Sequence, residues 1–222
     1  MIPHLHIEPD SPSPLTGLIR AVQEYYPVGY QIMNEQFEGF QKVKNIVGDK
    51  ITLLMNNTLP EHVNRLTDQL NDSFDGLEVY NFFSRQFPSY TGSIVLSDTK
   101  SERNERTVML TFNISLLTNC YTFFVEEHIK YRDIVHYGHP ARTVAVSRLS
   151  QTNREALDAI EKLDNVILSC FPDYIFADHC LLFNTQVSGV PYSEDGCGPD
   201  TKFPLYRFLF DMSSYPAAQV FP

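Results

Sequence analysis

The chain of 222 residues has no tryptophan and no uninterrupted apolar run of about 18 residues. Without such a run we expect no transmembrane helix and no membrane partner. The first residues, MIPHLHIEPDSPSP, lack the basic and apolar regions of a secretory signal. We therefore expect a cytoplasmic protein, while a leader removed ahead of residue 1 remains an alternative.

Cysteine is scarce, and its four positions (120, 170, 180 and 197) form no CxxC pair. This spacing favours free thiols in a reducing compartment over a disulfide framework. We expect buried thiols at Cys120, Cys170 and Cys180, which lie on apolar faces or runs, and an exposed thiol at Cys197, between two glycines.

Basic residues are outnumbered, with 17 Lys and Arg against 27 Asp and Glu and a net charge of −10. Residues 151–200 alone have nine acidic and two basic side chains, a net charge of −7. Such a balance repels a phosphate backbone, so nucleic acid is not the expected partner. A basic protein would be attracted and steered.

The common catalytic and cofactor motifs are also absent. The sequence has no GxGxxG, phosphate loop, GxSxG, HExxH or EF-hand pattern. We expect no cofactor and favour a non-enzyme, although a site assembled from distant residues would leave no motif.

Aromatic residues are plentiful (16 Phe and 12 Tyr) and suit a sheet-based core. Residues 107–116 alternate strictly, which predicts a strand of an antiparallel sheet with a covered apolar face and a wetter polar face. Further strands are expected at 77–83, 92–99 and 120–127, and residues 100–106 are expected to form a charged hairpin tip.

About three helices are predicted by apolar residues at helical spacing. The first begins at Ser13-Pro14 and ends before Pro27 and Gly29. The second follows a capping box at Thr58–Glu61 and ends at Gly76, and the third follows a capping box at Thr152–Glu155.

Four further segments are expected to be strands. Residues 30–41 and 43–56 contain β-branched runs around a Gly48-Asp49 turn, and residues 174–187 and 203–211 are rich in apolar residues. The sequence therefore predicts a single α+β domain over residues 1–222, a mainly antiparallel sheet with helices packed on it. A weak αβ duplication, with its second unit from about residue 150, is a further hypothesis.

The stretch HIKYRDIVHYGHP, residues 128–140, holds three of the seven histidines. His136 and His139 would share one face of a helix, but Gly138 and Pro140 argue against a helix here. We therefore expect a polar loop without a metal ion. The alternative is zinc bound with a third ligand from His128, Asp178, His179 or Cys180.

Two classes of function follow. The first is a non-catalytic binding protein whose acidic surface engages a basic protein, for example an inhibitor or immunity protein that neutralises a toxin, or a structural subunit of a larger assembly. The expected contacts are Asp158, Glu161, Glu194, Asp195 and Asp200. The second is a hydrolase that uses the histidine loop with bound zinc, or Cys180 or Cys197 as nucleophile with His179 as base.

Overall fold

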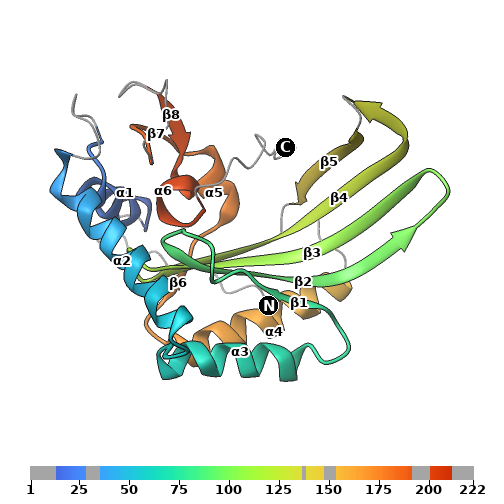
Figure 1. Ribbon diagram of the computed structural model, residues 1–222, viewed down its shortest axis with the longest axis horizontal. Helices are drawn as coiled ribbons and strands as arrows, with labels where there is room; N and C mark the ends of the chain where they lie inside the picture. The colour runs from blue at the N-terminus through green and yellow to red at the C-terminus, as the bar shows by residue number, and fades with distance from the viewer. Residues whose placement is uncertain (1–13, 29–35, 137–138, 148–153, 192–200, 212–222) are drawn as a thin grey trace.

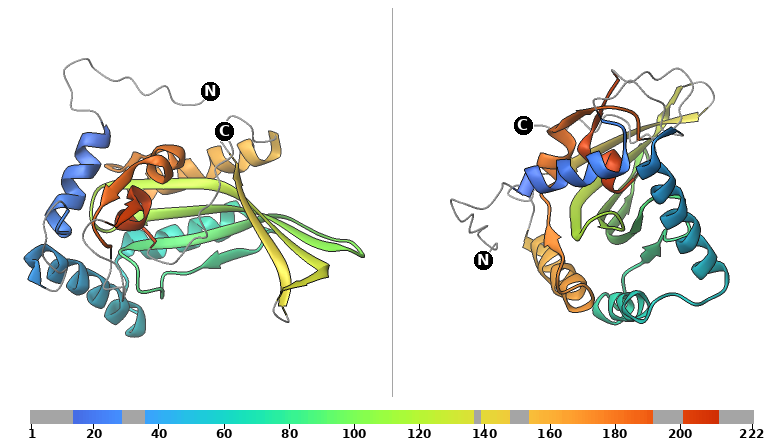
Figure 2. Two further views of the ribbon diagram at one scale, coloured as in Figure 1. Left: turned by 90° about the horizontal axis from the view of Figure 1, so that it is seen from above. Right: turned by 90° about the vertical axis from the view of Figure 1, so that its left-hand side faces the viewer.

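The computed structural model describes residues 14–28, 36–136, 139–147, 154–191 and 201–211. Its centre is a mainly antiparallel six-stranded sheet of order β1-β2-β3-β4-β5, to which the short β6 adds by parallel pairing with β4. The strands are β1 (Val79–Asn81), β2 (Ser89–Lys100), β3 (Asn104–Ser115), β4 (Cys120–His136), β5 (His139–Ser147) and β6 (Ile175–Phe176). The long strands extend beyond the helices as a curved ribbon (Figure 2).

Two helices cover one face of the sheet (Figure 1). They are α3 (Glu61–Ser73) and α4 (Arg154–Cys170). Their apolar stripes, which include Leu66 and Leu163, are buried against alternate residues of the strands, such as Leu110, Phe112 and Ile114. Each fully buried side chain of this kind contributes about 1.5–3 kcal/mol to the free energy of folding.

A second hydrophobic cluster lies on the other face. It is built by α1 (Pro14–Tyr25), α2 (Glu38–Met55), α5 (His179–Asn184) and α6 (Leu205–Leu209) with the two-stranded sheet of β7 (Gln186–Ser188) and β8 (Lys202–Pro204). Aromatic rings dominate it: Phe124 of β4 contacts Phe183 and Tyr206 edge-on. The two faces of one sheet therefore have separate cores.

The α+β class, the antiparallel sheet and the three predicted helices are confirmed. Four helices in the described part of the chain have seven residues or more, so the predicted number was low by one. The capping box at residue 58 was wrong, because Pro60 is the N-cap of α3 and Thr58 Oγ1 donates instead to Leu53 O. Ser13, Thr152 and Asn153 lie outside the described residues.

The extra helix is α2, where two strands and a Gly48-Asp49 turn were predicted. The β-branched residues misled the prediction, but the apolar residues recur at helical spacing, with Phe40 and Val43 buried and Val47 packed beside them. Gly48 lies on the exposed side of the helix, where no turn forms.

The C-terminal strand predictions were also largely wrong. Only residues 175–176, 186–188 and 202–204 are strands, and α5 and α6 occupy most of the rest. Asp178 explains the first helix, because its carboxylate accepts hydrogen bonds from Cys180 N and Leu181 N as an N-cap. Short apolar runs are ambiguous between strand and helix, and a cap decided this one.

The polar face of β3 is not wetter than its apolar face. Thr111, Asn113 and Ser115 are all buried, with the hydroxyl of Ser115 donating to Leu209 O of α6. Thr91 Oγ1 donates to Asn113 Oδ1 across the strands. Because α6 and its neighbours pack on this face, the polar side chains of β3 form hydrogen bonds within the protein instead of with water.

Among the described residues, no helix has the length and apolar character needed to cross a membrane.

Candidate functional site

Helices α3 and α4 present a surface that is rich in carboxylates. We call it the acidic helical face and define it by exposed acidic residues of the two helices and the turns that follow them. These are Glu61, Asp68, Asp72, Asp75, Glu78, Asp158, Glu161 and Asp173. The exposed cations on the same elements are Arg65, Arg154 and Lys162. The surface therefore has an excess of negative charge.

Two of these cations are held at the seam between the helices. Arg65 donates to Ser169 O at 3.2 Å, and Lys162 donates to Ser73 O at 2.9 Å. Both carbonyls lie at the C-terminal end of a helix, where main-chain acceptors are open and positive charge is favourable. The pairing also shows that α3 and α4 run antiparallel. The cations therefore serve helix packing and leave the carboxylates unneutralised.

Ion pairs are found elsewhere on the molecule. Glu105 of β3 binds Lys130 and Arg132 of β4, and Arg106 binds Glu127. The hydrogen bonds from Lys130 and Arg132 lower the pKa of Glu105. In contrast, within the described ranges no carboxylate of the acidic helical face forms an ion pair. Charge is balanced on the ribbon of strands and unbalanced on the helices.

Of the five predicted contact residues, Asp158 and Glu161 are exposed on α4. Glu194, Asp195 and Asp200 lie outside the described residues. The acids of α3 were not among the predicted contacts. The missing information was that α3 and α4, some ninety residues apart in sequence, lie side by side.

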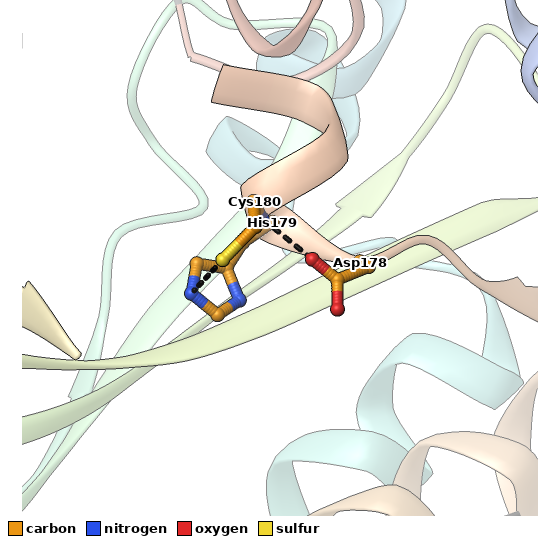
Figure 3. A group of neighbouring side chains, drawn as sticks. All are labelled: Asp178, His179 and Cys180. Atoms are coloured by element: carbon orange, nitrogen blue, oxygen red, sulfur yellow. Dashed lines mark hydrogen bonds between the residues drawn. The ribbon is translucent and has the colours of Figure 1, made fainter. Parts of the chain in front are cut away.

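A second candidate is the cluster Asp178, His179 and Cys180 at the start of α5 (Figure 3). Cys180 Sγ lies 3.5 Å from His179 Nε2, and Cys180 is partly exposed while His179 is buried. Cys180 was predicted to be buried, which was wrong, whereas Cys120 and Cys170 are buried as predicted. A thiol beside an imidazole can lose its proton to the ring and become nucleophilic.

The same three residues offer one ligand atom each within 4.8 Å of one another. The carboxylate, however, already caps α5, with Asp178 Oδ1 2.6 Å from Cys180 N. A tetrahedral zinc site also needs a fourth ligand, and the described residues supply no further His, Cys, Asp or Glu to this group. The arrangement is therefore better suited to a local hydrogen-bonded cluster than to a metal centre.

The predicted histidine loop is a hairpin. Residues 128–136 belong to β4, and His136 is paired with His139 of β5. Gly138 and Pro140 argued correctly against a helix, but the flanking residues 129–135 are strand-forming and extend the sheet. The metal-free expectation for this segment stays a prediction.

The structure adds a buried acid that the sequence reasoning missed. Glu126 of β4 is 2% exposed; it accepts a hydrogen bond from Thr111 Oγ1, and its other oxygen lies 3.1 Å from His128 Nε2. Ser93 continues the chain of hydroxyls, with its Oγ 2.9 Å from that of Thr111. The period-two pattern places residues 122, 124, 126 and 128 on one face and could have revealed it.

No family model, curated protein or solved structure matches this chain. The function must therefore be inferred from the geometry itself.

Proposed function

We propose that this is a non-catalytic cytoplasmic binding protein whose acidic helical face engages a basic protein partner. An inhibitor or immunity-type protein that neutralises a toxin suits this charge, because carboxylates can occupy a site that is built to bind phosphate. Glu194, Asp195 and Asp200 are further contacts in this proposal. Free thiols at Cys120, Cys170 and Cys180 agree with a reducing compartment.

The observation that supports the proposal is the set of carboxylates on α3, α4 and the turns after them, which form no ion pair with any described residue. Helix-dipole stabilisation accounts for Glu61, which lies in the first turn of α3. It does not account for Asp68, in the middle of α3, or for Asp72, in its last turn, where a negative charge is unfavourable. Like charges held close together destabilise the native state, and they become favourable when a cationic surface covers them.

The test is a charge reversal on α4 with a matched control. The double variant Asp158→Lys/Glu161→Lys changes the net charge as much as Asp49→Lys/Glu102→Lys, whose sites are exposed on α2 and at the β2–β3 turn. The partner is first isolated from the native host and purified, and association rates are then measured at several salt concentrations.

We expect the α4 double variant to associate about tenfold or more slowly at low salt and to show a weaker salt dependence. The association rate of the control should change only slightly, and circular dichroism should show that both variants are folded. Equal rates for the two double variants would contradict a role of the acidic helical face.

Thiol chemistry is a second candidate, favoured by the 3.5 Å contact between Cys180 Sγ and His179 Nε2. A hydrolase of this type would lose its activity on alkylation of Cys180, whereas the binding protein would keep its partner. Alkylation followed by the binding measurement separates the two candidates.

A further inference from the structure

Strand β1 is a short edge of the sheet beside α3 (Figure 1), and no other strand of the described residues pairs with its outer side. Val95 N donates to Glu78 O and Phe82 N donates to Thr91 O, both at 2.9 Å, so residues 78, 80 and 82 point their main-chain groups at β2. In an antiparallel pair this direction alternates. The N–H and C=O groups of Val79 and Asn81 therefore point outward, and they can pair with another strand.

A cleft of about 220 Å³ lies between this edge and α3. Its lining is mixed but has no lysine or arginine, and it consists of Thr67, Leu70, Asn71, Val79, Tyr80, Asn81, Phe83 and Phe112. Gly92 lets the ring of Phe112 reach this position, since a Cβ at Gly92 would lie 2.5 Å from the ring. The cleft can take one apolar side chain.

The charge around the cleft selects its occupant. Asp68, Asp72 and Glu78 are exposed and are sequence neighbours of the lining residues Thr67, Asn71 and Val79. A second copy of the same chain would bring the same acids against them, and like charges would oppose the contact. A lysine- or arginine-rich segment would be attracted instead.

We propose that β1 and this cleft bind an extended basic segment of the partner, which adds to the sheet as a further strand. Main-chain hydrogen bonds to Val79 and Asn81 supply affinity, one apolar side chain enters the cleft, and flanking cations face Asp68 and Asp72. This inference rests on the proposed function and names the form in which the basic partner is recognised.

The experiment uses a fluorescent peptide that alternates lysine with leucine, titrated against the full chain with anisotropy as the readout. Two peptide controls separate charge from backbone pairing: glutamate in place of lysine, and methylation of alternate main-chain nitrogens. The protein variant is Asn71→Trp, which fills the cleft from an exposed position, and its matched control is Asn165→Trp, exposed on α4.

We expect saturable binding of the lysine peptide that weakens about tenfold or more in Asn71→Trp and is unchanged in Asn165→Trp. Methylation in the pairing register should weaken binding to the wild-type chain by a similar factor, a test that needs no folded variant. Equal binding of methylated and unmethylated peptides would overturn strand addition.

The outcomes also distinguish this inference from the proposed function. If the peptide fails to bind but Asp158→Lys/Glu161→Lys still slows partner association, only the edge site is wrong. If neither responds, both proposals fall. A dimer of the chain, detected by light scattering and broken by Asn71→Trp, would assign the edge to a second copy and overturn the basic segment.

Discussion

At the residue scale, Lys50 is an unusual member of the interior. It is 2% exposed, and its Nζ donates to the carbonyl oxygens of Arg85, Phe87 and Ser89 at 2.7–3.0 Å. No carboxylate among the described residues pairs with it. One ammonium group thus holds the loop before β2 against α2, at the cost of burying its charge.

Burial lowers the pKa of Lys50 from 10.5 to about 8, which predicts a pH dependence of stability. Between these values the unfolded chain binds more protons than the native chain, so the free energy of unfolding should rise with pH. Chemical denaturation from pH 8 to pH 10 should therefore show the free energy of unfolding of the wild type rising relative to that of Lys50→Met, which lacks this ammonium group. The comparison with Lys50→Met is needed because burial also raises the pKa of the Cys120 thiol to about 12 and raises the pKa of Tyr26, and both groups lower the free energy of unfolding as the pH rises.

Cysteine reactivity is the second prediction at this scale. Cys120 and Cys170 are buried, and burial raises the pKa of the Cys120 thiol to about 12, whereas Cys180 is partly exposed beside His179. In a Cys197→Ser background, a thiol reagent should modify one group quickly in the native state and three after unfolding. Cys180→Ser should remove the fast phase, and a fast phase that survives this change would show that another thiol is accessible.

At the scale of elements, α2 illustrates how a glycine distinguishes a helix from a turn. Gly48 is exposed within α2, and a Cβ built there meets nothing within 4 Å. Its φ is not in the left-handed region, since the described glycines with positive φ are Gly76 and Gly189. Neither the backbone conformation nor the packing of α2 therefore requires glycine at this position.

We expect Gly48→Ala to raise the free energy of unfolding by about 0.5–1 kcal/mol, because alanine loses less backbone entropy in a helix. Denaturant titration measures it, and Gly92→Ala is the contrasting control. At Gly92 a Cβ would lie 2.5 Å from the Phe112 ring and 2.9 Å from Tyr80 O, so stability should fall. A loss of stability in Gly48→Ala would favour the turn that the sequence suggested.

At the scale of the whole molecule, the net charge of −10 is distributed unevenly over the surface. The charged side chains of β3 and β4 form ion pairs with one another, while the carboxylates of the acidic helical face form none with described residues. Salt screens repulsion between exposed charges over a Debye length of about 10 Å at 0.1 M. The electrostatic cost of the acidic helical face should therefore be visible in the salt dependence of stability.

We expect the melting temperature to rise as sodium chloride increases from about 0.05 M to about 0.5 M. Asp68→Asn/Glu161→Gln should melt higher than the wild type at low salt and respond less to added salt. The control Asp49→Asn/Glu102→Gln removes the same charge from sites outside the acidic helical face and should change the salt response less. A salt response that is the same in all three proteins would show that repulsion on this face is negligible.

Much of the architecture could be predicted because its signals are local. The strict alternation of residues 107–116 correctly predicted which side chains of β3 form its apolar face, and Phe112 on that face is 1% exposed. The apolar stripes of α3 and α4 were long enough to identify as helices. The wrong predictions concern α2, α5, α6 and the polar side of β3. In these segments the packing of neighbouring elements decides between strand and helix, or between an exposed and a buried face.

The candidate sites were harder to predict. Composition revealed an excess of carboxylates, and Asp158 and Glu161 were correctly expected to be exposed on a helix. The cleft at β1 went unnoticed because it joins residues from a helix and from different strands, whereas Glu126 and His128 lie two residues apart on β4 and their period-two spacing was overlooked. Spacing along one chain does not report which strands are neighbours.

The sequence by itself determined the charge and the period of the longer elements. These properties depend on residue identity and on side-chain spacing within one element. Only the tertiary structure decided that α3 and α4 lie together, that Arg65 and Lys162 bind main-chain carbonyls rather than carboxylates, and that β1 is left as an open edge. The reason is that burial and pairing depend on long-range packing, which sets the surroundings of each side chain.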